Sequence, residues 1–147
     1  FHRLMSAVIN WAEGHDEKVI VQSGNTPVNT TAIEFYDFVD HAKILDWINQ
    51  ASVVVCQGGF GSLQDCIQLG ANIVAVPRRH DGGESVDDQA ELVSALAEEG
   101  LVIPVYDMKD LGNAIELARQ GVGCESTMQS MQLSVAETVE AMLGVAE

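Results

Sequence analysis

The clearest chemistry in the sequence lies in a short glycine-rich segment, GGFGS at residues 58–62. It follows a β-branched apolar run at residues 52–56 and precedes an amphipathic pattern that begins near Leu63. A strand that turns through glycines into a helix leaves backbone N–H groups at the helix N-terminus, where the helix dipole favours an anion. The segment therefore predicts a phosphate site.

Further polar residues fall where they could hold other parts of a phosphate-bearing ligand. Asp65 lies one helical turn after Ser62, on the same face of the predicted helix. Its ionised carboxylate only accepts hydrogen bonds, so it suits a pair of sugar hydroxyls and would repel phosphate. Arg78 and Arg79 follow the next apolar run. Either guanidinium could clamp a diphosphate with two hydrogen bonds, or both could simply balance nearby acids such as Asp81.

Histidines are few, and their spacing does not predict a metal site. His2, His15 and His41 are scattered, whereas His80 lies in the same loop as the arginines. His80 is the one histidine to test as an acid or base, and Arg78 is the other catalytic candidate. We expect no metal and no separate cofactor, and the catalytic residue stays unknown.

Helices and strands that would position these residues alternate along the chain. Apolar periodicity predicts helices over residues 1–13, 42–50, 61–69, 87–99, 109–119 and 126–143, and strands over residues 19–21, 32–39, 52–56, 73–76 and 101–105. Such alternation is typical of a largely parallel sheet covered on both faces. We expect a doubly wound, Rossmann-like α/β domain, whose ligands lie beyond the carboxyl ends of the strands.

In this architecture, two more features of the sequence can be interpreted: the polar residues after the first predicted strand, and the helix with which the sequence opens. Ser23 and Gly24 follow the first predicted strand and so belong on the ligand side of the sheet, although a plain polar loop explains them equally well. The sequence opens on a helix without an initiator Met, whereas a doubly wound domain normally opens on a strand. We therefore expect a first strand to be missing from this sequence.

Charge and composition narrow the range of partners. The 147 residues include 7 Lys and Arg against 22 Asp and Glu, a formal net charge of −15. Such a chain repels polyanions, which argues against nucleic acid and against unaided docking on anionic lipid. No apolar stretch approaches the ~18 residues of a membrane span. Three cysteines without a CxxC pair suit a reduced, cytoplasmic protein in which they are small apolar fillers.

Five pieces of the sequence, in order and spacing, resemble the C-terminal donor-binding domain of glycosyltransferase family 28. They are FHRL at residues 1–4, VQSG at 21–24, ASVVVCQGGFGSLQD at 51–65, VPRR at 76–79 and GESVDDQ at 83–89. The chain is most similar to the small, separately encoded subunits of two-part enzymes, such as the soluble subunit of the dolichyl-diphosphate-GlcNAc transferase and bacterial exopolysaccharide relatives. The resemblance covers about residues 1–107. In this family a strand with a glycine–threonine loop precedes the first helix, in agreement with the missing strand.

The resemblance implies half of a GT-B fold that binds a UDP-sugar. The length of the chain predicts a single domain over residues 1–147. With the resemblance, we expect it to be a nucleotide-sugar-binding domain with C-terminal helices from about residue 109. In the family a Gly-x-Gly-Ser/Thr turn meets the diphosphate, an acidic residue three positions later bonds the ribose, and a Gln after the Pro-Arg loop lies nearby. On this basis we expect Gly59, Gly61, Ser62, Asp65 and Gln89 to bind the substrate. The other residues of the expected substrate-binding site are Ser23, Gly24, Gln57, Gly58, Phe60 and Arg78.

Two departures from the family bear on catalysis more than on binding. Many relatives carry His where this chain has Gln57, and another His where it has Ser85. If either histidine were the general base, this chain would lack that base, although glutamine and serine still form hydrogen bonds. The aromatic ring of Phe60 is open to stacking on uracil, to contact with a partner subunit, or to simple packing.

The resemblance also implies an enzyme that works with a partner. We expect a subunit that is cytoplasmic, or peripheral at the cytoplasmic face of a membrane through that partner. It would transfer a hexose, GlcNAc or uronic acid to a lipid-linked acceptor in polysaccharide or glycolipid synthesis, with a membrane-associated second subunit binding the acceptor. Two alternatives stay open: a non-catalytic nucleotide-sugar-binding or assembly module, and another α/β nucleotide binder such as an ADP-sugar or flavin protein.

Overall fold

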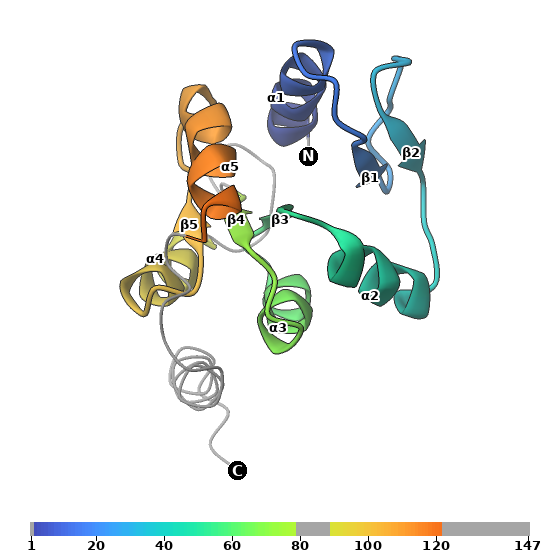
Figure 1. The fold of residues 1–147 in the computed structure, drawn as a ribbon. Coiled ribbons are helices and arrows are strands. Elements are labelled where there is room, and N and C mark those ends of the chain that lie inside the picture. The colour runs from blue at the N-terminus through green and yellow to red at the C-terminus, as the bar shows by residue number, and fades with distance from the viewer. Residues whose placement is uncertain (1, 79–88, 122–147) are drawn as a thin grey trace. The chain divides into compact units, whose positions relative to one another are not determined.

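Figure 1 presents the computed structural model of the chain, in which residues 2–78 and 89–121 are described. The chain divides into two compact units, Phe1–Trp47 and Ile48–Glu147. Each unit contains a parallel sheet, with two strands in the first unit and three in the second. The helix predicted over residues 126–143 lies outside the described residues.

The first unit opens with helix α1, His2–Glu13, as predicted. Gly14 and His15 end it by donating backbone hydrogen bonds to Trp11 and Ala12, and the His15 ring stacks on Trp11 with 4.1 Å between centroids. Thus His15 closes a helix.

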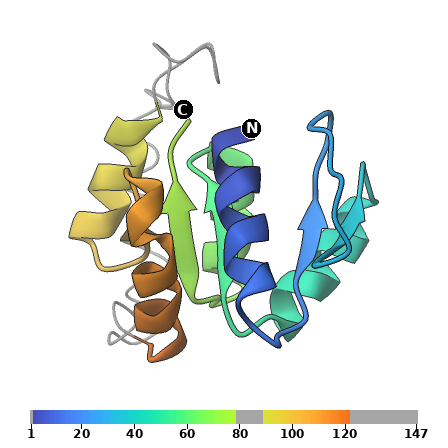
Figure 2. The ribbon, with the colours of Figure 1, turned by 90° about the horizontal axis from the view of Figure 1, so that it is seen from above.

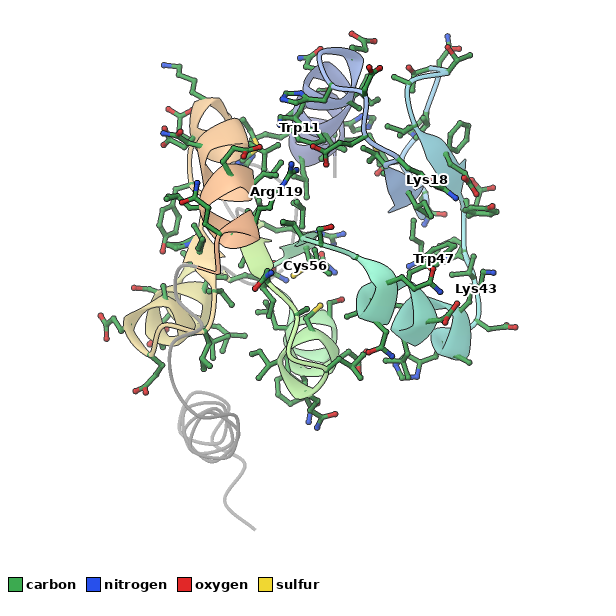
Figure 3. All side chains as sticks on the ribbon, viewed as in Figure 1. Trp11, Lys18, Lys43, Trp47, Cys56 and Arg119 are labelled. Atoms are coloured by element: carbon green, nitrogen blue, oxygen red, sulfur yellow. The ribbon has the colours of Figure 1, made fainter. Side chains whose placement is uncertain are left out.

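Strands β1, Ile20–Gln22, and β2, Glu34–Tyr36, pair in parallel, with Ile20 opposite Glu34. The strand predicted over residues 32–39 is therefore much shorter than expected. All three β2 residues are exposed, so no apolar burial extends the pairing further. Helix α2, His41–Gln50, follows and carries the boundary between the two units. Its Trp47 ring lies 5.3 Å from the Tyr36 ring and 6.0 Å from Nζ of Lys43 (Figure 3).

In the second unit, strands and helices alternate as expected for a doubly wound sheet. Its elements are β3 (Val54–Gln57), α3 (Phe60–Gln68), β4 (Ile73–Val76), α4 (Ala90–Glu98), β5 (Ile103–Pro104), the 3-10 turn η1 (Met108–Asp110) and α5 (Leu111–Arg119). The strand order is β3-β4-β5, all parallel, with Val54 opposite Ile73 and Val74 opposite Ile103. Figures 1 and 2 show α5 along one face of this sheet, and α3 and α4 along the other.

The core of the second unit forms around β4. Each of its four side chains is at most 3% exposed, because β3 and β5 flank the strand and helices cover both faces. Large buried side chains from the three helices complete this core: Leu63, Val93, Leu96 and Leu111. The continuous apolar run of β4 is typical of a parallel strand buried on both faces.

Glycines end the three helices that flank this sheet, and the sequence indicates two of them, Gly70 and Gly100. Gly70 and Gly100 have φ angles of 70° and 73° after α3 and α4, and their N–H groups bond to Ile67 and Ala97. A left-handed residue at this position is the common helix stop, and glycine adopts it without strain. Both stops lie at the opposite end of their helices from the candidate site. No helix among residues 2–78 and 89–121 is long and apolar enough to cross a membrane.

Candidate functional site

The glycine segment forms the connection between β3 and α3. Gly59 precedes the helix in an extended conformation, and α3 begins at Phe60, one residue earlier than the sequence pattern suggests. The first intrahelical bond runs from the N–H of Leu63 to the carbonyl of Gly59, at 3.2 Å. The N–H groups of Phe60, Gly61 and Ser62 therefore precede the helical ladder.

These three residues are exposed, and Gly59 has no side chain with which to cap the helix. Their N–H groups are donors at the positive end of the helix dipole, the arrangement that binds phosphate and carboxylate groups. The Ser62 hydroxyl adds a donor on the same turn. The structure thus has an exposed helix N-terminus at the glycine segment, and its use as an anion site stays a prediction.

Packing requires glycine at position 58 but not at position 61. A Cβ on Gly58 would lie 2.5 Å from Cγ2 of Val93 and 3.2 Å from Cα of Pro77. Only glycine fits there without displacing α4 or the β4 loop. A Cβ on Gly61 would meet nothing within 4 Å, so packing does not demand glycine at that position. The open space in front of Gly61 lies at the helix N-terminus, where a ligand would approach.

Two glutamine side chains flank the loop. An ideal Cβ on Gly59 would lie 3.4 Å from Nε2 of Gln57 and 3.5 Å from Nε2 of Gln89. The amide nitrogens of both residues are therefore beside Gly59. The Oε1 atom of Gln57 is buried and has no hydrogen-bond partner among the described residues.

The loop that follows β4 is joined to this region by a hydrogen bond. The backbone N–H of Arg78 donates to Oε1 of Gln89 at 3.1 Å. Gly58 is tied to the same strand end, because its N–H donates to the carbonyl of Val76 at 3.2 Å. Thus Arg78, Gln89 and the glycine segment lie together, as the sequence-based site requires. Arg79 and His80 fall outside the described residues.

Asp65 lies on α3 one turn beyond Ser62 and is half-buried. This spacing places both side chains on one face of the helix. Asp65 is therefore displaced by about one turn along the helix from the three N–H groups. Its assignment to a ribose stays a prediction.

Cys56 lies on β3 and Cys66 on α3, the two elements that the glycine segment connects. Figure 3 labels Cys56. A hydrogen bond with Cys66 and burial together raise the pKa of the Cys56 thiol well above its ordinary value. A buried, protonated thiol is a poor nucleophile and a poor metal ligand. In the described part of the chain, no group of three His, Cys, Asp or Glu side chains could hold a metal ion.

Ser23 and Gly24 belong to the first unit, directly after β1. Ser23 is 7% exposed, and its N–H and Oγ–H both donate to the carbonyl of Tyr36. Gly24 has a φ of 58° and packs against the Phe38 ring, 3.7 Å from its ideal Cβ. The local role of both residues is to close the β1–β2 pair, and a role in binding a substrate stays a prediction.

The sequence analysis did not predict a cluster of polar residues at the β1–β2 sheet. The Tyr36 hydroxyl donates to Glu34 at 2.5 Å, and Lys18 lies 3.5 Å from the same carboxylate. The hydrogen bond from Tyr36, with the charge of Lys18, lowers the pKa of Glu34 below its ordinary value of 4.5. The alternation of Glu34 and Tyr36 on one face of β2 was the available signal.

Val93 was also missed, although it sets the position of the glycine loop. It lies one helical turn after Gln89, so the i, i+4 spacing places both side chains on the face of α4 that contacts Gly58. Among the described residues of the second unit there is no histidine. The assembled groups can therefore hold an anion and stabilise negative charge, but they supply no imidazole for proton transfer.

Comparisons with known proteins identify the family and the fold. Residues 1–142 match the family described as the glycosyltransferase family 28 C-terminal domain. No curated protein matches the chain. Among solved structures, the glycotransferase of kitacinnamycin is 18% identical with a TM-score of 0.61, and covers 95% of this chain. The spinosyn forosaminyltransferase SpnP is 12% identical with a TM-score of 0.66, and covers 96%.

These likenesses establish the fold. The chain spans 37% of each of the two solved structures, which are glycosyltransferases of the GT-B type. It therefore has the Rossmann-like architecture of one part of a GT-B protein, as the sequence predicts.

Proposed function

The chain belongs to the glycosyltransferase family 28 C-terminal domain family, and from this premise we propose that it binds the UDP-sugar donor of a two-component glycosyltransferase. The observation that carries the proposal is the exposed N-terminus of α3, where the N–H groups of Phe60, Gly61 and Ser62 precede the helical ladder. A diphosphate bound there would meet three backbone donors and the Ser62 hydroxyl. The open space at Gly61 lets phosphate oxygens approach the backbone.

The remaining groups fit the other parts of a nucleotide-sugar. The carboxylate of Asp65, one turn along α3, would accept hydrogen bonds from the two ribose hydroxyls. The amides of Gln57 and Gln89 flank Gly59 and are neutral, so they can donate to oxygen atoms without repelling phosphate. Arg78 follows β4, and its guanidinium would pair with the diphosphate. The exposed ring of Phe60 is available to stack on uracil.

The chemistry that this site supports is stabilisation of the leaving group. When the bond between the sugar and UDP breaks, negative charge grows on the terminal phosphate. Preorganised N–H groups, Ser62 and Arg78 would stabilise that charge without reorganising. Transfer also requires a base for the acceptor hydroxyl. Gln57 and Ser85 stand where many relatives carry histidines, and the described residues of the second unit include no histidine, so we assign the base to a partner subunit.

The partner that fits is a membrane-associated subunit that binds a lipid-linked acceptor. The net charge of −15 disfavours direct docking of this chain on anionic lipid, so a protein would hold it at the membrane face. The transferred group would be a hexose, GlcNAc or uronic acid, and the product a polysaccharide or glycolipid precursor. A non-catalytic binding or assembly module is the second candidate, and the glutamine at position 57 is the observation that favours it.

Calorimetric titration tests the binding half of the proposal. We expect UDP to bind this chain more tightly than AMP or FMN. The control is Ser94→Ala, a change on the exposed side of α4, which should bind the three nucleotides with the same affinities as the parent chain. Equal affinity for the three nucleotides, or no binding of UDP, would contradict a UDP-sugar site.

Transfer assays test the catalytic half. The chain alone should transfer no sugar from a UDP-sugar, and transfer should appear when the acceptor-binding subunit is added. Turnover by the chain alone would contradict the two-component proposal. Binding of UDP without transfer in the reconstituted pair would favour the non-catalytic module.

A further inference from the structure

We propose that Gln89 is a positioning residue, which fixes Arg78, directly after β4, against the glycine loop so that the Arg78 guanidinium and the N–H groups of α3 face one ligand. The proposal extends the proposed function, because the ligand is the diphosphate considered above. It assigns to Gln89 an architectural role that does not depend on contact with that ligand.

The first observation is the unusual use of the Gln89 side chain. Gln89 immediately precedes α4, yet its side chain makes no capping hydrogen bond to that helix. Instead, its Oε1 accepts a hydrogen bond from the N–H of Arg78, eleven residues earlier. A side chain at a helix start normally satisfies the N–H groups of its own first turn. Here it satisfies the backbone of another loop.

The second observation is that the same side chain packs on the glycine loop. Its Cβ lies 3.2 Å from an ideal Cβ on Gly58, and its Nε2 lies 3.5 Å from one on Gly59. Both glycines lack the atoms that would push Gln89 away. One half-buried side chain thus contacts the β3–α3 connection and holds the backbone that follows β4.

Together these contacts link the backbone of Arg78, directly after β4, to the glycine loop. Arg78 is half-buried, so its N–H would lose its acceptor in a place where water replaces it poorly. Without the bond, the backbone of Arg78 would be free to move away from Gly59. The Arg78 guanidinium and the N–H groups of α3 would then no longer be held at a fixed spacing.

Two variants separate the acceptor from the rest of the side chain. Gln89→Met keeps the length and removes both polar atoms. Gln89→Glu keeps an oxygen that can accept from Arg78, but adds negative charge beside Gly59. Glu91→Gln, an exposed change in the first turn of α4, is the matched control. Amide exchange at Arg78 and at Leu63, read by NMR, and UDP titration are measured for each variant.

We expect Gln89→Met to accelerate exchange at Arg78 and to weaken UDP binding by about tenfold each, the scale of one net hydrogen bond. Exchange at Leu63 should stay unchanged, which excludes general unfolding of α3. Gln89→Glu should restore protection of Arg78 while UDP binding stays weak, because its carboxylate repels phosphate. Glu91→Gln should alter neither measurement.

The outcomes distinguish this proposal from the proposed function. Unchanged exchange at Arg78 in Gln89→Met would overturn the coupling of the loops, whatever the chain binds. Faster exchange with unchanged UDP affinity would overturn the positioning role. If the parent chain binds no UDP, the proposed function fails, and faster Arg78 exchange in Gln89→Met, restored in Gln89→Glu, would still support the coupling of the loops.

Discussion

Gly58 and Val93 approach so closely that a Cβ on Gly58 would lie 2.5 Å from Cγ2 of Val93. The contact joins the end of β3 to the face of α4, two elements separated by the whole of α3 and β4. It fixes how far the glycine loop lies from α4, and therefore where the N-terminus of α3 is held. Glycine at position 58 is thus a requirement of packing.

Gly58→Ala should lower the free energy of unfolding of the chain by about 1–3 kcal/mol, the usual cost of overpacking a core. Chemical denaturation followed by circular dichroism measures the change. Gly61→Ala is the matched control, since its new Cβ would meet nothing within 4 Å and alanine favours the helix. That control should gain about 0.5–1 kcal/mol. Equal stability of Gly58→Ala and the parent would contradict the contact.

Gly61→Ala also tests where a diphosphate binds. Because the methyl group would occupy the space in front of the α3 N–H groups, we expect UDP affinity to fall while stability does not. A fall of about tenfold or more corresponds to ~1.4 kcal/mol of lost binding. Titration calorimetry alongside thermal unfolding separates the two effects. Unchanged UDP affinity would place the diphosphate away from the start of α3.

Asp65→Ala should weaken binding of UDP more than binding of inorganic pyrophosphate. The carboxylate is expected to accept hydrogen bonds from the ribose, which pyrophosphate lacks, and bonds to a charged group contribute about 1.5–3 kcal/mol. Competition titrations with both ligands on the parent and the variant give the comparison. An equal loss for the two ligands would refute the ribose assignment, and a gain for both would indicate that Asp65 only repels anions.

Tyr36→Phe should raise the pKa of Glu34 toward its ordinary value of 4.5, because the phenol hydrogen bond is the main cause of the lowered pKa. Carboxyl-carbon NMR titration reports the shift. Since the folded-state pKa is lowered, the stabilisation from Glu34 is present above its unfolded pKa and disappears as the pH falls through the folded pKa. The parent and the variant should therefore differ near neutral pH and converge in acid. Identical titration curves for Glu34 would contradict the interaction.

Sequence patterns predict the fold of the second unit well because its signals are local. Apolar runs rich in Val and Ile mark β3 and β4, and the glycines at positions 70 and 100 mark where helices end. The glycine segment is equally easy to predict, since a strand, a glycine turn and a helix follow one another directly in the chain. These features need no knowledge of distant contacts.

Features that depend on tertiary contacts could not be predicted in this way. The pattern marks Gly58 as part of a phosphate loop, but its need for glycine comes from Val93, on another helix. Likewise, the bond between Arg78 and Gln89 depends on how the segment between them folds back. Ser23 was interpreted as a ligand-side residue, and its bonds to Tyr36 become visible only once β1 and β2 are paired.

The one-sided pairing of β3 has a consequence for amide exchange along this strand. Within the described residues, β3 has a hydrogen-bonded neighbour on one side only, and the N–H groups of Val54 and Gly58 point toward that neighbour, β4. By the alternation of a strand, the N–H groups of Val55 and Gln57 point the other way. The hydrogen bonds of the described residues therefore protect the N–H groups of Val54 and Gly58 from exchange with solvent. Slow exchange at Val55 and Gln57 would reveal a further strand on the other side of β3.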